Sequence, residues 1–364
     1  MQPAAVRDAL LARPPMLADR LGNGPDNSLL LRHLAALLVI YGHAYALLGP
    51  TDSGVDLLAR AIPRFYAGSI GVCLFFALSG CLITHSWLRN PGIFRFLRAR
   101  ILRIYPAYLV CLLCTVGLIG PFFSELSPHA YFEHVQTVKY VLRNIDLIGL
   151  TYVLPGLFAG NPVPFVANGS MWSLALEVRM YAVIALFGAI GMLSWPRIFT
   201  IVVLAFVLYC LLGWVAIAPL HQDKAALAML FMMASLIAMF ASRIPLSTRC
   251  LSIFVVLVVA TAKSFLFVTV TMLALGYFSL WFCWRLPAMR LPWRSDYSYG
   301  LFLYGFPVQQ MVVAAHPEVS PLELFGLAVP LSLVLAMASW HWVEQPCLRL
   351  KQWGSLDPAS MPRS

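Results

Sequence analysis

Charged residues are scarce in this chain. Asp, Glu, Lys and Arg make up 11% of its 364 residues, while 61% are hydrophobic and the mean hydropathy is +0.81. A soluble domain carries about 25% charged residues, and one of this length cannot hide so much apolar surface. The shortage of charge excludes a water-soluble globular protein. It predicts an all-α, polytopic membrane protein whose spans are helices.

Several local patterns that carry common chemistries are also missing. The sequence contains no zinc-ligand spacing, P-loop, GxGxxG or GxSxG motif, and no repeat of fixed period. Cys111 and Cys114 form a CxxC inside an apolar run without companion ligands, so packing is favoured over a metal or redox role. Residues 1–28 lack the continuous apolar core of a signal peptide, and we interpret them as a polar cytoplasmic tail.

Apolar runs separated by polar breaks predict about ten membrane-spanning helices. They form a domain over 29–346, followed by a cytoplasmic tail over 347–364. The hairpin around Lys263 joins the seventh span, which is short, to the eighth. The expected spans are 29–48, 66–86, 104–123, 172–193, 198–219, 225–242, 250–262, 264–284, 297–316 and 322–341.

The distribution of basic residues predicts the orientation of these spans. Eighteen Lys and Arg residues fall on the side of the N-terminus and six on the opposite side, with Arg179 inside a span. Basic residues concentrate in cytoplasmic segments, so both termini are expected in the cytoplasm. The net charge of +10 is therefore a topology signal and needs no nucleic acid to explain it. The extracytoplasmic segment 124–171 has a Pro- and Gly-rich end that predicts a folded or re-entrant loop.

The first span carries two ionisable side chains at a helical spacing. Arg32 and His43 stand eleven residues apart, which brings them to within about 20° of one helical face, with His43 roughly 16 Å deeper. Ionisable groups are costly inside a membrane and usually face a bundle interior or wet cavity with a function. A core histidine bonded to a backbone carbonyl is the alternative interpretation of His43.

Arginines crowd between the second and third spans, around the stretch FLRARILRIYP. Arg100 and Arg103 are spaced by three and share a helical face, and guanidinium forks bind phosphates bidentately. They could therefore hold the phosphates of a cytoplasmic donor. A charge cluster that anchors the helix at the cytoplasmic surface is an equally good interpretation.

Two polar positions lie within the second and fourth spans. Ser79 in FFALSG suits either close helix packing or the shaping of a passage. Glu177 in NGSMWSLALEVRMY follows Trp172 into the fourth span from the outer side, and a carboxylate at that depth needs a partner. Glu177 could pair with an arginine elsewhere, or hold the imidazole of His43 in one tautomer.

The C-terminal segments SYGLFLYGFPVQQ and WHWVEQP are rich in aromatic residues. Tyr304, Gln309 and Gln310 could line a sugar site, because sugar faces stack on rings and amides bond to hydroxyls. Interface anchoring is the alternative role of the aromatic residues. Glu344 is expected to form an ion pair with a loop arginine at the cytoplasmic end of the last span.

Taken in order, these motifs resemble those of the membrane-bound acyltransferase 3 family in its standalone form. The resemblance rests on Arg32 and His43, FFALSG at 75–80, Arg100 and Arg103 with Pro106, Trp172 with Ser173 and Glu177, the segment 298–307, and Glu344 with Pro346. It implies a multi-pass enzyme of the bacterial inner membrane. Such an enzyme moves an acyl group, usually acetyl, from cytoplasmic acyl-CoA to a hydroxyl of a lipid-linked or cell-surface carbohydrate.

The resemblance and the chemistry together suggest a role for each residue. Acyl transfer to a hydroxyl needs a base for the hydroxyl proton and donors for the oxyanion. We expect His43 to be the base and Glu177 to orient it, with no metal and no permanently bound cofactor. Acyl-CoA is expected at Arg32, Arg100 and Arg103. The carbohydrate acceptor is expected at Ser79, Trp172, Tyr304 and Gln309.

Two other classes of function remain open. A proton-coupled transporter or flippase of a lipid-linked sugar also buries Arg, His and Glu among its helices, although no inverted repeat is evident here. A scaffold among polysaccharide assembly proteins would make no use of His43. Stabilisation by acetyl-CoA distinguishes an enzyme from a carrier.

Overall fold

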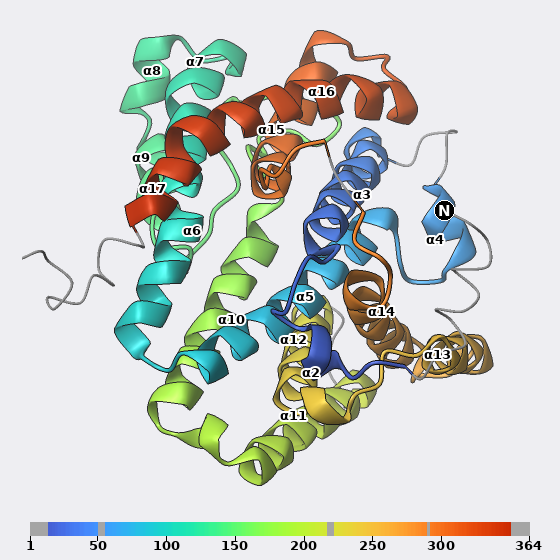
Figure 1. The fold of residues 1–364 in the computed structure, drawn as a ribbon. Coiled ribbons are helices and arrows are strands. Elements are labelled where there is room, and N and C mark those ends of the chain that lie inside the picture. Colours follow the sequence, from blue (N-terminus) through green and yellow to red (C-terminus); the bar gives the residue numbers. More distant parts are fainter. Residues whose placement is uncertain (1–13, 50–54, 217–221, 290–291, 351–364) are drawn as a thin grey trace, which may run out of the picture.

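The protein is described by a computed structural model that covers residues 14–49, 55–216, 222–289 and 292–350. Within these ranges the chain is all-helical, and extended contacts are limited to isolated bridges such as the one between Met16 and Pro245 (Figure 1). The outer parts of both predicted tails, 1–13 and 351–364, lie outside the described residues. So do five of the basic residues used for the orientation, namely Arg7, Arg13, Arg290, Lys351 and Arg363.

In the described part of the chain, a helix lies over each range that was predicted to span the membrane. These helices are α3 (Ser28–Leu48), α5 (Ala67–Arg89), α6 (Ile93–Cys114), α10 (Met171–Ala189), α11 (Pro196–Ala216), α12 (Gln222–Met239), α13 (Thr248–Thr261), α14 (Phe267–Trp284), α15 (Ser298–Ala315) and α16 (Pro321–Ser339). Among the described residues, six stretches are long and apolar enough to cross a membrane. They are α3, α5, α10, α14, the continuous stretch Ile93–Phe123 and the continuous stretch Pro321–Leu350.

Short helices extend or connect the long ones. Two π-helical segments, η1 (Thr115–Ile119) and η5 (Trp340–Glu344), continue α6 and α16 into α7 (Gly120–Phe123) and α17 (Gln345–Leu350). The other short elements are α2 (Leu17–Arg20), α4 (Leu57–Ala61), α8 (Pro128–Glu133), α9 (Val135–Asn144), η2 (Met192–Ser194) and η4 (Ala241–Arg243).

Helix α6 begins at Ile93, about three turns before the predicted start of the third span at residue 104. From the sequence, the arginine-rich stretch is placed between the second and third spans, with Arg100 and Arg103 on one helical face. Arg, Leu and Ile are nevertheless helix-compatible residues, and Gly92 with φ +150° marks the actual boundary. Arg100 and Arg103 therefore lie on the helix itself and can reach the interior of the bundle.

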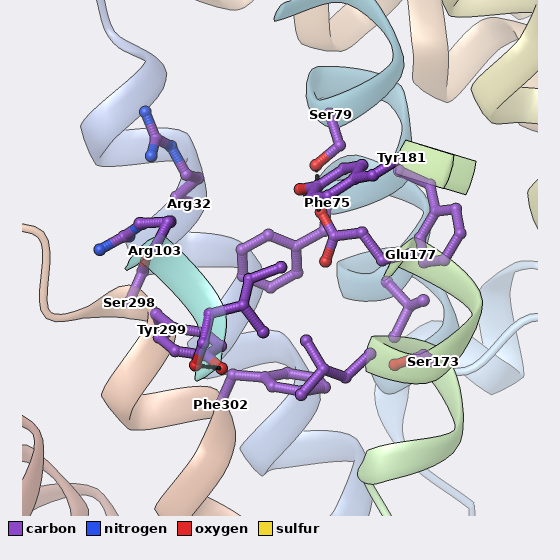
Figure 2. Close-up of a pocket in the computed structure, with 14 residues that line it drawn as sticks. Arg32, Phe75, Ser79, Arg103, Ser173, Glu177, Tyr181, Ser298, Tyr299 and Phe302 are labelled. Carbon is purple, nitrogen blue, oxygen red and sulfur yellow. Dashed lines mark hydrogen bonds between the residues drawn. The ribbon is translucent and has the colours of Figure 1, made fainter. Parts of the chain in front are cut away.

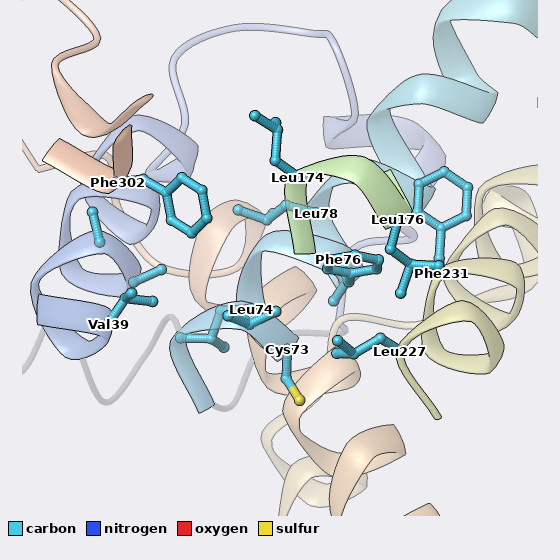
Figure 3. Packing of buried hydrophobic residues seen from close by; sticks show 14 of the residues in the cluster. Val39, Cys73, Leu74, Phe76, Leu78, Leu174, Leu176, Leu227, Phe231 and Phe302 are labelled. Atoms are coloured by element: carbon cyan, nitrogen blue, oxygen red, sulfur yellow. The ribbon is translucent and has the colours of Figure 1, made fainter. Parts of the chain in front are cut away.

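Helix α5 lies at the centre of the bundle and packs against α3, α10, α12 and α14. Its apolar side chains, Phe76 and Leu78 among them, meet Leu174 of α10 and Phe231 of α12 in the core (Figure 3). Gly80 allows the close approach of α12, because a Cβ there would collide with the carbonyl oxygen of Phe231. Small residues at such positions let helix backbones approach in a membrane.

The segment between α9 and α10 folds back onto the bundle. Asn168 Nδ2 donates to the carbonyl of Leu303 at 2.9 Å, and Gln310 Nε2 donates to the carbonyls of Val163 at 2.8 Å and Val166 at 3.0 Å. Arg179, which had no explanation from the sequence, donates to the carbonyl of Ile148 in this segment at 2.8 Å. The predicted folded loop is thus attached to α15 and α10.

Candidate active site

A cavity of about 110 Å³ lies among α3, α5, α6, α10 and α15 (Figure 2). It has room for several water molecules. Its apolar wall consists of Val72, Phe75, Phe76, Ile104, Leu174 and Phe302. Its polar lining consists of Arg32, Ser79, Arg103, Ser173, Glu177, Tyr181, Ser298 and Tyr299.

One side of this cavity is basic and carries a network of ion pairs. Asp296, the residue two before the start of α15, accepts from Arg32 Nη1 and from Arg103 Nη2, both at 2.7 Å. Arg103 Nη1 donates to Glu344 Oε2 at 3.0 Å, so Glu344 forms an ion pair as predicted, with an arginine of α6. The guanidinium of Arg103 also lies over the rings of Tyr299 and Trp340, 5.6 and 5.7 Å from their centroids.

Asp296 is ionised in this network. Burial by itself would raise its pKa, but the charges of Arg32 and Arg103 and the Ser298 hydroxyl outweigh burial. They hold the pKa of this carboxyl well below its usual range. Two arginines and two carboxylates, those of Asp296 and Glu344, therefore share one network at the cavity.

The opposite side of the cavity is formed by Glu177 and two hydroxyl groups. Glu177 Oε1 accepts hydrogen bonds from Ser79 Oγ of α5 and from Tyr181 OH of its own helix, the second at 2.6 Å. In Figure 2 these three side chains lie across the cavity from Arg32 and Arg103, with the Phe75 ring between the two groups. The cavity is thus lined by arginines on one side, by a carboxylate on the other side and by apolar side chains between them.

His43 lies outside the lining of this cavity. Its half-buried ring meets the ring of Phe306 edge-on, with 5.3 Å between centroids. Phe306 is one turn along α15 from Phe302, which lines the cavity. Gly169, at the end of the long loop, packs against the same Phe306 ring. The structure therefore places His43 about one helical turn beyond the cavity, toward the loop.

Glu177 was expected to orient His43, but the structure does not bring the two side chains together. Among the described residues no hydrogen bond joins the two, and the bonds of Glu177 go to Ser79 and Tyr181. The helical spacing of Arg32 and His43 predicts that both side chains face the bundle, where Arg32 lines the cavity and the His43 ring packs on Phe306. It carried no information about the partner that Glu177 finds on α5.

Arg100 lines a neighbouring cavity of about 280 Å³ between α6 and α10. This second cavity shares Ile104 and Tyr181 with the first. The Arg100 guanidinium lies over the Phe96 ring at 5.7 Å, and its buried Nε has no hydrogen-bond partner within the described ranges. Arg100 is therefore more available to an anionic ligand than Arg103, which is paired twice.

Three of the residues predicted to contact the acceptor lie away from the Arg32–Glu177 cavity. Trp172 is half-buried against the core, and Tyr304 lines a largely apolar cavity of about 310 Å³ beside Cys111 and Cys114. Gln309 is fully buried, and its Nε2 donates to the carbonyl of Ile40 at 2.8 Å. Only Ser79 of the predicted acceptor residues lines the cavity itself.

Asp296 is the central residue that the sequence analysis missed. One signal was available, because it is the only acidic residue between Asp223 and Glu318. It also comes directly before SYGLFLYGFP, on the side where Arg32 begins the first span. A lone carboxylate near several span-end arginines predicts an ion pair, although it does not say which arginines take part.

Comparison with known proteins agrees with this architecture. The acyltransferase domain model of the acyltransferase 3 family matches residues 29–341, which include every helix that lines the cavity. The O-acetyl transferase of Shigella phage Sf6 is 28% identical over 331 residues, covering 86% of this chain and 93% of that protein. Nodulation protein 10 of Rhizobium leguminosarum bv. viciae is 25% identical over 390 residues, covering 90% and 94%.

A third relative, protein 2 in the picA locus of Rhizobium radiobacter, is 31% identical over 184 residues, covering 45% of this chain and 84% of that protein. No solved structure matches the chain. The family model spans far more than half of the chain. The chain therefore belongs to the acyltransferase 3 family and is an acyltransferase enzyme with a membrane-embedded helical domain.

Proposed function

We propose that this enzyme transfers an acyl group, most simply acetyl, from cytoplasmic acyl-CoA to a hydroxyl of a lipid-linked or cell-surface carbohydrate. The observation that carries the proposal is the family match over 29–341, which contains the whole cavity with its arginines and Glu177. The phage relative, named an O-acetyl transferase, supports acetyl as the group and oxygen as its acceptor atom. The proposed location is the inner membrane of a bacterium.

The proposed topology has ten spans and both termini in the cytoplasm. A helix over each predicted range supports the count, and the excess of basic residues on the side of the N-terminus supports the orientation. In this arrangement the start of α3, with Arg32, faces the cytoplasm. The loop between α7 and α10 faces outward, so donor and acceptor approach from opposite sides.

Arg32, Arg100 and Arg103 are the proposed donor-binding residues. Guanidinium groups bind phosphate oxygens through paired N–H donors, and acyl-CoA carries three phosphate groups next to a long, narrow pantetheine arm. Arg100 Nε has no hydrogen-bond partner among the described residues, which supports a phosphate role for this residue. The cavity beside Arg32 and Arg103 is the proposed place of the pantetheine arm and the thioester.

His43 is the proposed general base. The hydroxyl oxygen of the acceptor forms a bond to the thioester carbon, and the imidazole takes the hydroxyl proton. The carbon–sulfur bond then breaks, and the proton passes from His43 to the leaving CoA thiolate. The place of His43, one turn beyond the cavity toward the outer loop, supports a meeting of the two substrates there.

Glu177, which lines the cavity, is proposed to take part in the reaction from there. Its carboxylate accepts hydrogen bonds from the hydroxyl groups of Ser79 and Tyr181, and the three side chains form a candidate acid–base cluster at the cavity. Trp172, Tyr304 and Gln309 remain proposed contacts of the acceptor. Since Gln309 is bonded to α3, a sugar would reach it only if α3 and α15 separate locally.

Mass spectrometry of surface glycans tests this function. A deletion strain is complemented with the wild type, His43→Ala or Arg100→Gln, with membrane expression checked by immunoblot. We expect an ester-labile mass increment with the wild type only, and the size of the increment identifies the acyl group. Restoration of that increment by His43→Ala would contradict the base assignment. Loss of surface glycan without any change in its mass would favour a carrier of lipid-linked sugar instead.

A further inference from the structure

A single carboxylate oxygen holds two guanidinium groups from different helices at the cavity. Asp296 Oδ2 is 2.7 Å from Arg32 Nη1 of α3 and 2.7 Å from Arg103 Nη2 of α6. The two nitrogens therefore lie within twice that distance of each other. Like charges this close repel unless an anion lies between them. Asp296 is thus the group that allows both arginines to occupy the same wall of the cavity.

The carboxylate of Asp296 is itself held in one orientation. Its second oxygen, Oδ1, accepts from the Ser298 hydroxyl at 2.5 Å and from the Ser298 backbone N–H at 3.3 Å. Both contacts come from the first residue of α15. The direction of Oδ2 is therefore set by the start of this helix, and the side chain of Asp296 is 12% exposed.

The two arginines differ in the donors they have left. Arg103 uses Nη1 for Glu344 and Nη2 for Asp296, and it is stacked on two rings. Arg32 uses Nη1 for Asp296 and Nε for the carbonyl of Ser28 at 3.4 Å. Within the described ranges no residue accepts from Arg32 Nη2. Arg32 lines the cavity and is 30% exposed, so it retains free donors there.

We propose that Asp296 is a positioning residue for acyl transfer. It fixes Arg32 against the immobile Arg103, so that the free N–H groups of Arg32 Nη2 meet an oxygen of the acyl-CoA donor in the cavity. The inference rests on the proposed function, because it takes acyl-CoA as the donor. Asp296 touches neither substrate and acts through Arg32.

The test measures acetyl-CoA turnover by purified protein in nanodiscs, with lipid-linked glycan extracted from the host as the acceptor. Rates are normalised to the folded fraction from size-exclusion chromatography. For Asp296→Asn we expect kcat to fall about 30-fold, while the KM for acetyl-CoA changes less than about threefold, because misaimed guanidinium groups still attract the donor. A purely structural role predicts less folded protein with an unchanged kcat.

A double-mutant cycle shows whether Asp296 acts through Arg32. On an Arg32→Gln background, Asp296→Asn should lower kcat by no more than about twofold, because the residue being positioned is already gone. If the falls in kcat of the two single variants multiply in the double variant, the proposal is overturned. A kcat of Asp296→Asn equal to that of the wild type would also overturn it. If Asp296→Asn does not fold, Ser298→Ala decides the question. A fall in kcat of about threefold supports the proposal, and an unchanged kcat rejects it.

Asp56→Asn is the matched control. Asp56 is also a buried aspartate before a helix, but its carboxylate accepts from backbone N–H groups, including those of Leu58 and Ala67. This variant should lose stability and keep the wild-type kcat. If the wild type itself neither binds nor turns over acetyl-CoA, the proposed function fails. An active wild type with an unaffected Asp296→Asn rejects only the present inference.

Discussion

The carboxylate of Glu177 accepts hydrogen bonds from the hydroxyl groups of Ser79 in α5 and Tyr181 in α10. An isolated carboxylate is costly at this depth in a membrane, and two hydroxyl donors recover part of that cost. The same bonds fix the positions of both hydroxyls at the cavity. A substitution that removes the negative charge of Glu177 but keeps the shape of its side chain therefore separates its chemical role from its role in packing.

We expect Glu177→Gln to reduce acetyl transfer by at least about 100-fold, the scale of a lost group that takes part in acid–base chemistry. The amide occupies nearly the same volume, so the amount of folded protein should change little. Ser79→Ala, which leaves the carboxylate in place, should lose about tenfold or less. Turnover of acetyl-CoA by purified variants measures both effects, and full activity of Glu177→Gln would exclude Glu177 from the reaction.

Asp296 gives a prediction about pH. An unfolded aspartate titrates near pH 4, whereas the arginines hold the pKa of folded Asp296 below its usual range. A lowered pKa in the folded state contributes stability that is present above about pH 4 and is lost as the pH falls through the folded pKa. Asp296→Asn should therefore cost about 3 kcal/mol near neutral pH, and the cost should shrink in acid.

Thermal unfolding followed by tryptophan fluorescence, from pH 3 to pH 7 in detergent, measures this difference. The gap in unfolding temperature between the wild type and Asp296→Asn should be largest at neutral pH and smallest at pH 3. A gap that stays constant over the whole range would show that the charge of Asp296 does not contribute to stability.

At the scale of elements, the packing of α5 against α12 depends on the absence of a side chain at Gly80. A Cβ there would collide with the carbonyl oxygen of Phe231, which belongs to a helix backbone and cannot move alone. Gly80 directly follows Ser79, so one turn of α5 supplies both a polar group for the cavity and a packing surface for α12. Displacement of α5 would therefore also shift Ser79 away from Glu177.

Gly80→Ala should destabilise the protein by about 1–3 kcal/mol, because an added methyl forces two packed helices apart. Gly326→Ala in α16 is the control, since a Cβ at Gly326 meets no atom within 4 Å. That change should be neutral or stabilise by up to about 1 kcal/mol through helix propensity. Melting temperatures of the two variants decide the matter, and equal values would show that α5 and α12 have room to adjust.

The positions of the helices could be predicted from the sequence, because long apolar runs in a membrane have few alternatives to a helix. The side-chain contacts between these helices could not be predicted. Arg32 and Asp296 are separated by 264 positions, and hydrophobic periodicity says nothing about which face of α3 meets the start of α15. The same limit applies to Glu177, whose bond to Ser79 crosses 98 positions. The proposed pairing of Glu177 with His43 drew on chemical plausibility alone.

At the scale of the whole molecule, the arrangement of spans sets the side from which each substrate arrives. We expect a fluorescent protein fused to the C-terminus to fluoresce, because it would fold in the cytoplasm. Alkaline phosphatase inserted after His129, an exposed residue of α8, should be active because it would be exported. Both reporters in a bacterial host test the orientation. A dark C-terminal fusion together with an inactive phosphatase after His129 would place the arginine network on the outer side and would contradict the proposed route of acyl-CoA.

The loop between α9 and α10 forms hydrogen bonds with α15, a helix that is synthesised much later. Its partners Leu303 and Gln310 follow it by 135 to 147 positions. At about 5–20 residues per second, a ribosome needs roughly 7 to 30 seconds to reach them. During that interval the amide groups of Asn168 and the carbonyls of Val163 and Val166 are without their final partners. The docking of α15 is therefore a late stage of biogenesis, and until then a membrane protease would have access to this loop.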